Sequence, residues 1–508
     1  MSDDEPQDGG QASDLPEGWS SNANERFLIT LARADGEPHA SFQPEFTYPI
    51  FGEQEAIFGY KGLLIELNFA AHSLEPRLHI SYDAIYRAQG DIKPTDIKAA
   101  ITDFLPEEAF LDTQISYTDA ASFIPPGERV RAYRRDGKQY EVRCASLADA
   151  DAKRLLERMQ ILIPLFIEGG TMLQLEQDWT TKRWKLFTLW LVDAAEQGSS
   201  LYSLVGYGTS YRVFAALKIA SKSAVYSGAE AEPDFLSPER SADDISSPLE
   251  LPSRERLSQF LILPEFQGSG HGQELYRAIY KHLTTPNNIR EFTVEDPNES
   301  FDDLRDFCDI TYLRSQNPEF AGLEINTDMP AGSLGSDKTV PTDLIVSKEL
   351  RDKIQTSEKM DKRQFDRLVE MHTLSKIPAL HRSRNRITRR EKTSNKHDKQ
   401  YYFWRLYVKQ RLLIFNRDAL MQLEPQERVE KLEAAVDSNQ EYIVNMIEKV
   451  TKKEARGISI DGDELAPTNG ARSAKAAAKK RKVLDDDDDD EEDGQLATPT
   501  ASKKPKVS

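Results

Sequence analysis

The spacing of apolar and polar residues predicts a strand, a loop, a helix and a second strand in close succession. The apolar run from Leu257 to Leu263 predicts a strand buried on both faces, which Pro264 ends. A second strand, from Phe292 to Val294, leads directly into two carboxylates, Glu295 and Asp296. Between them, helical spacing resumes at the apolar positions Leu275, Tyr276, Ile279 and Leu283.

The same patterns predict further elements on both sides of this segment. The apolar positions of Leu147 to Ile167 indicate one helix, and the chain after Leu344 is helical and charged to about Lys449. The polar segment Asp193 to Ser200 predicts the turn of a hairpin. Extended segments are expected at Phe46 to Tyr48, Gly62 to Phe69, Leu78 to Tyr82, Trp184 to Val192 and Leu201 to Tyr211.

The loop before the predicted helix has the sequence Gln267-Gly268-Ser269-Gly270-His271-Gly272. Unpaired N–H groups at a helix N-terminus, together with the helix dipole, favour an anion such as a pyrophosphate. The loop lacks the lysine and hydroxyl of a P-loop and the G-x-G-x-x-G spacing of a dinucleotide fold. It is similar to the Q-x-x-G-x-G loop of GNAT-type acetyltransferases, which binds coenzyme A, although a plain tight turn is the alternative.

Longer stretches resemble the catalytic subunit of the type B histone acetyltransferases. FLILPEFQGSGHG and TVEDPNESFDDLRD carry the resemblance, together with Phe51 to Leu63, Leu165 to Gly170 and Lys376 to Arg384. It covers residues 27–423 and implies an α/β (α+β) fold. In this fold a GNAT acetyltransferase core with a mixed, splayed central sheet lies between an N-terminal α/β domain and a C-terminal helical domain.

Composition and resemblance together predict five parts of the chain. The ends and the insertion are polar, charged or low in complexity, which is typical of segments without a core. The parts are a disordered acidic N-terminus (1–22), an α/β substrate-positioning domain (23–148), the acetyltransferase core (149–345) with an exposed insertion (221–252), a helical domain (346–450) and a disordered tail (451–508).

Acetyl transfer to lysine requires a base, because a free lysine amine has a pKa of about 10.4 and is protonated near neutral pH. The resemblance assigns this role to Glu295, with Asp296 as an auxiliary and Glu168 as a third carboxylate of the same cleft. The alternative for Asp296 is a loop carboxylate that caps the helix beginning near Asn298.

The resemblance also implies which groups bind acetyl-CoA, without any metal. The backbone of the first strand would pair with the amide-rich pantetheine arm, and the loop would hold the phosphates. For Asn298 an Asx turn is the alternative, and His271 is expected to act through its backbone N–H. The residues are Phe260, Leu261, Ile262, Gln267, Gly268, Ser269, Gly270, His271, Gly272, Gln273 and Asn298.

Five residues are candidates for contact with the peptide substrate. Glu53, Gln54 and Glu55 match a family segment that contacts the histone tail. Tyr207 and Tyr211 could flank the aliphatic part of the lysine. A solvated acidic loop and ordinary strand aromatics are the alternatives.

Composition and charge indicate which partners and which cellular location are expected for the protein. The net charge is −19, which suits a basic substrate and argues against tight binding of nucleic acid by the whole chain. There are two cysteines, no apolar stretch of about 18 residues, and no signal-peptide pattern. We therefore expect a soluble protein of the nucleus and cytoplasm, with no membrane association.

Two basic segments have different interpretations. From Lys376 to Arg417 aromatic residues lie among basic ones, but their helical spacing favours core packing over nucleic-acid contact. Lys479 to Val483 has the form of a nuclear import signal and would bind an import receptor. The nine acidic residues from Asp485 to Asp493 would solvate the tail or bind histones.

The predicted function is acetylation of lysines in the N-terminal tail of newly made histone H4, by direct attack of the amine. The resemblance further implies a histone-binding partner of the β-propeller (WD-repeat) class. Two alternatives remain open at the level of the sequence: a histone-binding chaperone with little activity, and an acetyltransferase for non-histone lysines.

Overall fold

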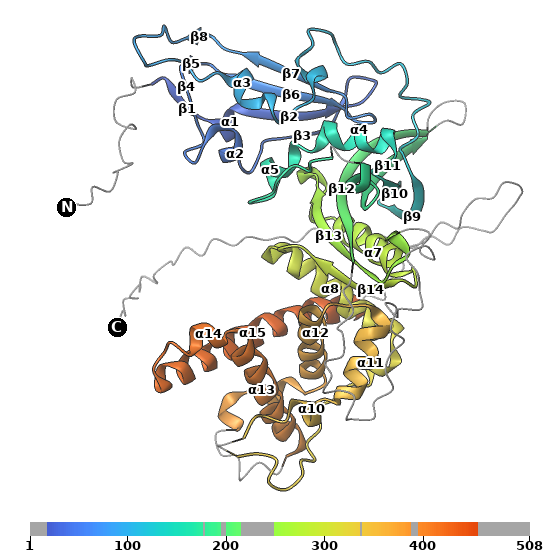
Figure 1. Cartoon of the computed structure of the whole chain (residues 1–508), viewed down its shortest axis with the longest axis vertical. Helices are drawn as coiled ribbons and strands as arrows, with labels where there is room; N and C mark the ends of the chain where they lie inside the picture. The colour runs from blue at the N-terminus through green and yellow to red at the C-terminus, as the bar shows by residue number, and fades with distance from the viewer. Residues whose placement is uncertain are drawn as a thin grey trace, which may run out of the picture. The chain divides into compact units, whose positions relative to one another are not determined.

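The computed structural model describes residues 18–175, 178–194, 200–214, 248–335, 338–387 and 395–455. Figure 1 shows strands as far along the chain as β14 and only helices in the last part. The predicted disorder up to residue 17, most of the insertion (221–247) and the tail from residue 456 lie outside the described residues. Within the described part of the chain, no helix is both long and apolar enough to cross a membrane.

The N-terminal region is rich in β-structure. A four-stranded sheet has the order β3-β2-β6-β7, and two small two-stranded sheets pair β1 with β4 and β5 with β8. The sheet buries Phe27, Ile29, Ile65 and Leu67 against short helices. The elements are β1 (Ser20–Asn22), α1 (Ala23–Arg26), β2 (Phe27–Ala32), β3 (Pro38–Phe42), α2 (Tyr48–Phe51), β4 (Ala56–Phe58), β5 (Tyr60–Lys61), β6 (Leu64–Ala70), β7 (Pro76–Ser81), β8 (Ala84–Ile85) and α3 (Ile97–Thr102).

A six-stranded mixed sheet follows, in the order β14-β13-β12-β11-β10-β9. Only β13 and β14 are parallel, and every other neighbouring pair is antiparallel. Strands β9 and β10 precede residue 149, so two strands of this sheet come from the predicted N-terminal domain (23–148). The elements are β9 (Glu128–Arg135), β10 (Lys138–Ser146), α4 (Ala150–Met159), α5 (Leu162–Phe166), α6 (Asp178–Thr181), β11 (Trp184–Ala194), β12 (Ser200–Phe214), β13 (Ser253–Ile262), α7 (His271–Thr284) and β14 (Ile289–Val294).

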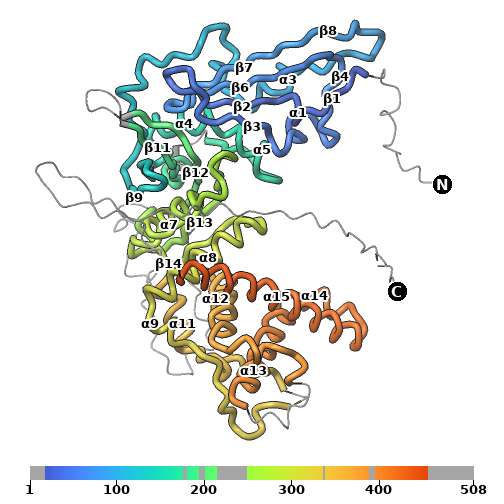
Figure 2. The backbone as a smooth tube through the Cα atoms, turned by 180° about the vertical axis from the view of Figure 1, so that it is seen from behind, coloured from blue at the N-terminus to red at the C-terminus, as the bar shows by residue number. Residues whose placement is uncertain are grey.

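The C-terminal part consists of helices that pack on one another and on α8. The long helix α15 runs back from α14 to α8 (Figure 2). Tyr401, Trp404 and Tyr407 are buried, which confirms the core packing predicted for the aromatic residues. The helices are α8 (Glu299–Gln316), α9 (Pro318–Ala321), α10 (Thr342–Ile345), α11 (Lys348–Glu358), α12 (Lys362–Ser375), α13 (Lys396–Phe415), α14 (Arg417–Leu420) and α15 (Pro425–Ala455).

Most predicted elements are confirmed, and three differ. The helix expected over Leu147 to Ile167 is two helices, because Pro164 has no N–H to donate to the carbonyl of Gln160 and can lie only in the first turn of a new helix. Tyr48, expected to be extended, begins α2, whose first turn holds Pro49. In β13 buried residues alternate with half-buried ones up to Leu261, so the strand is not buried on both faces throughout.

Candidate functional site

A cavity of about 820 Å³ lies where β13, β14, α5 and α7 approach one another. The end of β13 and the glycine-rich loop form one side, and the loop from Val294 to Phe301 forms another. Residues after α5 and the segment around Tyr48 line it from the N-terminal region. The cavity is therefore assembled from segments that are far apart in the sequence.

One wall of the cavity is a strand edge with no neighbouring strand. β13 and β14 pair only as far as Leu257 and Val294, and the N–H of Glu295 then donates to the carbonyl of Leu257 at 2.9 Å. Asp296 has φ of +35°, and the chain turns away there. Among the described residues, 259–262 of β13 pair with β12 alone, and Ser258 lies at a register shift between the two strands. Such an edge can pair with the amide groups of a ligand.

The glycines of the loop are required for different reasons. Gly268 and Gly270 have φ of +71° and +76°, a conformation that side chains disfavour. A Cβ at Gly270 would also lie 2.1 Å from Nη1 of Arg135, whose guanidinium donates to the carbonyl of Ser269. A Cβ at Gly272 would lie 2.7 Å from Cδ1 of Leu304. Glycine at these positions therefore leaves the backbone of the loop open to a ligand, and a larger residue would have to displace Arg135 or Leu304 or adopt a disfavoured φ.

Side chains on both sides of the loop hold it in place. The Nε2 of Gln267 donates to the carbonyl of Ile262 at 2.9 Å. His271 is buried, and its Nδ1 shares a hydrogen bond of 2.7 Å with the hydroxyl of Tyr133. Burial and the nearby Arg135 lower the pKa of His271 to about 4. Its side chain is therefore a neutral part of the core.

Strands β12 and β13 supply the groups that surround Glu295. The hydroxyl of Tyr211, on β12, donates to Oε1 at 3.0 Å, and the hydroxyl of Ser258, on β13, donates to Oε2 at 2.6 Å. Arg256 donates to the Tyr211 hydroxyl at 3.2 Å and lies 3.7 Å from Oε1. Burial, followed by the contact with Glu295, raises the pKa of Tyr211 although Arg256 opposes it. Tyr211 therefore stays protonated and able to donate.

Asp296 and Glu168 line the same cavity as Glu295. Glu168 is exposed and follows α5, where the N–H of the next residue donates to the hydroxyl of Tyr48 at 2.9 Å. Asp296 does not cap α8; the cap is Asn298, whose Oδ1 accepts from the N–H of Phe301 at 2.9 Å. Both carboxylates are thus available to a ligand, and Asn298 has a structural role at the mouth of the cavity.

The five residues expected to contact the peptide are not among those that line the cavity. Glu53 and Gln54 are exposed, and Glu55 accepts from the N–H of Thr47 at 2.6 Å, so its carboxylate supports the backbone. None of these three lines the cavity. Tyr207 is fully buried in the core, whereas Tyr211 reaches Glu295.

Among the residues of the site that sequence reasoning missed are Glu45, Tyr48, Arg256 and Ser258. Glu45 is the fourth carboxylate on the cavity wall, and no lysine or arginine is among the described residues that line it. Ser258 carried a usable signal, because it is a polar interruption of an apolar run. The other three lie on segments whose contact with the cavity depends on the fold.

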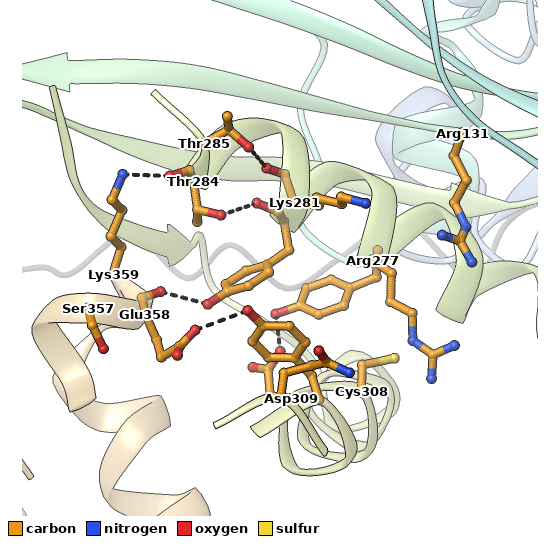
Figure 3. Close-up of a pocket in the computed structure, with 14 residues that line it drawn as sticks. Arg131, Arg277, Lys281, Thr284, Thr285, Cys308, Asp309, Ser357, Glu358 and Lys359 are labelled. Carbon is orange, nitrogen blue, oxygen red and sulfur yellow. Dashed lines mark hydrogen bonds between the residues drawn. The ribbon is translucent and has the colours of Figure 1, made fainter. Parts of the chain in front are cut away.

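A second cavity, of about 440 Å³, lies between α7, α8 and the end of α11 (Figure 3). Its tyrosines bond to neighbouring groups: Tyr280 to the carbonyl of Glu358 at 2.6 Å, Tyr312 to the Glu358 carboxylate at 3.1 Å, and Tyr276 to Asp309 at 2.9 Å. These contacts join the helices.

Within the described ranges, no cluster of three His, Cys, Asp or Glu side chains could hold a metal ion.

Comparison with known proteins identifies similar sequences over most of the chain. Residues 19–168 match the family described as "Histone acetyl transferase HAT1 N-terminus", and residues 332–377 match "Fungal HAT1, C-terminal". The histone acetyltransferase type B catalytic subunit of Aspergillus oryzae is 39% identical over 459 residues, which cover 86% of this chain and 87% of that protein. The subunits from Pyricularia oryzae and Candida albicans are 34% and 30% identical, over 90% and 83% of this chain and 98% and 87% of their own lengths.

Proposed function

The chain belongs to the family of type B histone acetyltransferase catalytic subunits, which are acyltransferases, and from this premise we propose that it acetylates lysines in the N-terminal tail of newly made histone H4. One observation supports the proposal above all. Glu45, Glu168, Glu295 and Asp296 share one cavity with an open strand edge and a glycine-rich loop. A basic peptide is attracted by the carboxylates, while the edge and loop suit an acyl donor with amides and phosphates.

Acetyl-CoA fits the groups present on the other side of the cavity. The backbone of Phe260, Leu261 and Ile262 would hold the pantetheine amides, and the loop from Gln267 to Gln273 would hold the phosphates at the N-terminus of α7. The positive φ of Gly268 and Gly270 supports this assignment, because it brings backbone rather than side chains to the ligand. When bound, acetyl-CoA supplies the acetyl group as a reactive thioester. We propose on these grounds that the six-stranded sheet and the glycine-rich loop form a GNAT-type acetyltransferase core.

Glu295 would act as the general base. A lysine ammonium must lose a proton before its nitrogen is a nucleophile, and Glu295 is a hydrogen-bonded carboxylate at the strand end next to the open edge. Asp296 and Glu168 would stabilise the incoming ammonium. We expect the amine to attack directly, without an acylated cysteine, because Cys144 and Cys308 are buried and burial raises the pKa of each thiol to about 12.

The peptide would approach along the acidic wall formed with the N-terminal region. Glu45 and Tyr48 line the cavity there. Glu53 and Gln54 follow shortly after Tyr48 in the sequence and are exposed, so they would add polar groups for the peptide. Tyr211 is held by Glu295 and Arg256, which favours a role in positioning the base over one in contacting the lysine.

The partners and the cellular location that we propose rest on the family and on the basic cluster in the C-terminal tail. We propose a WD-repeat histone-binding subunit as partner, and an import receptor that recognises Lys479 to Lys482. The protein would then act in both the cytoplasm and the nucleus. Direct binding of nucleic acid is not part of the proposal.

The proposal is tested by incubating the full chain with labelled acetyl-CoA and each core histone separately, and by mapping modified lysines by mass spectrometry. Label confined to tail lysines of histone H4 is expected. Histone binding without label would favour a chaperone, and label on other proteins with none on histones would favour a non-histone acetyltransferase.

A further inference from the structure

The hydroxyl of Ser258 lies at the junction between the carboxylate and the open strand edge. In the sheet register Tyr211 is opposite Arg256, and Arg256 is opposite Thr293. Ser258 lies two residues after Arg256, at a shift in the register between β12 and β13, and Glu295 directly follows the end of β14. The structure brings both side chains to the point where the pairing of β13 with β14 ends. Ser258 is also the first residue of β13 beyond the last pair with β14.

The contact between Ser258 and Glu295 has the length of a strong hydrogen bond. At 2.6 Å, the O···O distance lies in the range of a hydroxyl that donates to an ionised carboxylate. A serine hydroxyl has one proton to donate and two lone pairs that accept. Because its proton is directed at Oε2, its lone pairs are left for a donor. Ser258 lines the cavity and is half-buried, so such a donor can come from the substrate.

The other oxygen of the carboxylate is fixed from the opposite side. Oε1 accepts from Tyr211, and Arg256 holds Tyr211 while lying 3.7 Å from the same oxygen. The ring of Trp184 packs on Tyr211 with centroids 4.6 Å apart. Tyr211 and Arg256 therefore determine the orientation of Glu295, and Oε2 is the oxygen that is directed to the cavity through Ser258.

We propose that Ser258 is a catalytic residue that relays the proton of the substrate ammonium to Glu295. One N–H bond of the ammonium breaks as an O–H bond forms at Oγ of Ser258. The original hydroxyl proton moves to Oε2 of Glu295, and the nitrogen keeps the electron pair with which it attacks the acetyl group. No oxidant or further reactant is needed. The inference rests on the proposed role of Glu295 as base and adds the route by which the proton reaches it.

Ser258→Ala tests the relay, with kcat and KM measured on a histone H4 tail peptide. We expect kcat to fall about 10²-fold, at the lower end of what a positioned proton-transfer group contributes, with little change in KM for acetyl-CoA. Ser258→Thr keeps the hydroxyl and should restore most of the rate. Tyr211→Phe removes the other hydrogen bond to Glu295 and should cost clearly less than Ser258→Ala. Thermal unfolding of each variant checks that the fold is retained.

The possible outcomes distinguish the role of Ser258 as a proton relay from the role of Glu295 as the base. A large loss in Glu295→Gln with full activity in Ser258→Ala would overturn the relay and leave Glu295 as base. Equal losses in Ser258→Ala and Tyr211→Phe, without rescue by threonine, would reduce Ser258 to a positioning residue. Near-normal rates in both Glu295→Gln and Ser258→Ala would reject the base itself.

Discussion

Nζ of Lys453, near the end of α15, donates a hydrogen bond of 2.9 Å to Oε1 of Gln273, in the first turn of α7. The ammonium also lies 4.8 Å from the ring centroid of Phe307 on α8. Burial, with the nearby Arg277, lowers the pKa of Lys453. The C-terminal helices are thus attached to the loop that we propose binds acetyl-CoA.

Lys453→Ala should weaken acetyl-CoA binding about three- to tenfold, because a hydrogen bond contributes about 0.5–1.5 kcal/mol and 1.4 kcal/mol is tenfold. Lys449→Ala is the matched control, since Lys449 lies on the same helix and pairs with the partly exposed Asp303 at 3.2 Å. Calorimetric titration of both variants checks this. Equal affinities would mean that α15 does not support the loop.

Gly270→Ala should weaken acetyl-CoA binding more than Gly268→Ala. Both positions have positive φ, so both variants carry a backbone cost of roughly 1–2 kcal/mol. Only at Gly270 would the new methyl group also displace Arg135, whereas nothing lies within 4 Å of a Cβ at Gly268. Titration of the folded variants measures the difference. The reverse order would mean that the hydrogen bond from Arg135 to the carbonyl of Ser269 does not support acetyl-CoA binding.

Glu295→Gln should lower kcat by about 10²–10⁴-fold at neutral pH while leaving acetyl-CoA affinity nearly unchanged, because the amide keeps the shape but accepts no proton. The loss should shrink towards pH 10, where the substrate amine becomes neutral by itself. Steady-state rates across pH test this, with Glu168→Gln and Asp296→Asn as comparisons. If one of these two shows the larger loss, that carboxylate is the base.

Titration of Asp309 should lower the free energy of unfolding as the pH rises from about 4 to 7. Its carboxylate is buried and accepts from Tyr276 at 2.9 Å and from Gln364 at 3.0 Å. Burial raises its pKa to about 7, although the buried Arg305, 3.6 Å away, opposes this. The folded state therefore holds a proton that the unfolded state, with a pKa near 3.9, has already released. This contribution is complete below pH 4 and is lost by pH 7, at up to about 1.4 kcal/mol per pH unit.

Asp309→Asn cannot titrate and should flatten this pH dependence. Denaturant unfolding at pH 5, 6, 7 and 8 compares the two proteins, and the difference between their slopes should be largest below pH 7. Parallel curves across the whole range would show that Asp309 is ionised in the folded protein at pH 5.

Removal of the tail after Ala455 should change location but not turnover on a short histone peptide. The cut keeps Lys453 and its contact with Gln273, and it removes the basic cluster at Lys479 to Lys482. Lys480→Ala with Arg481→Ala should likewise move the protein from the nucleus to the cytoplasm. A truncated protein that stays nuclear would indicate import through a partner.

The local elements of this protein were predictable because their signals lie within a few residues. Apolar spacing identified β13 and α7, and the end of β14 placed two carboxylates. A helix was expected to begin near Asn298, but the side chain that caps it was not predicted, since Asp296 was the candidate and Asn298 is the cap. The resemblance to the family rests on the same short segments. The break between α4 and α5 could also have been found, since Pro164 stands within the predicted helix.

The sequence by itself determined which side chains and local elements are present, including the strand, the loop and Glu295. Only the tertiary structure decided how they meet. Tyr211 and Glu295 are 84 residues apart and Ser258 and Glu295 are 37 apart, so their contacts depend on the register of three strands. Register is set by core packing across the whole sheet, and a shift of one residue would turn Ser258 to the opposite face. Such cross-strand relations leave no local pattern in a single sequence.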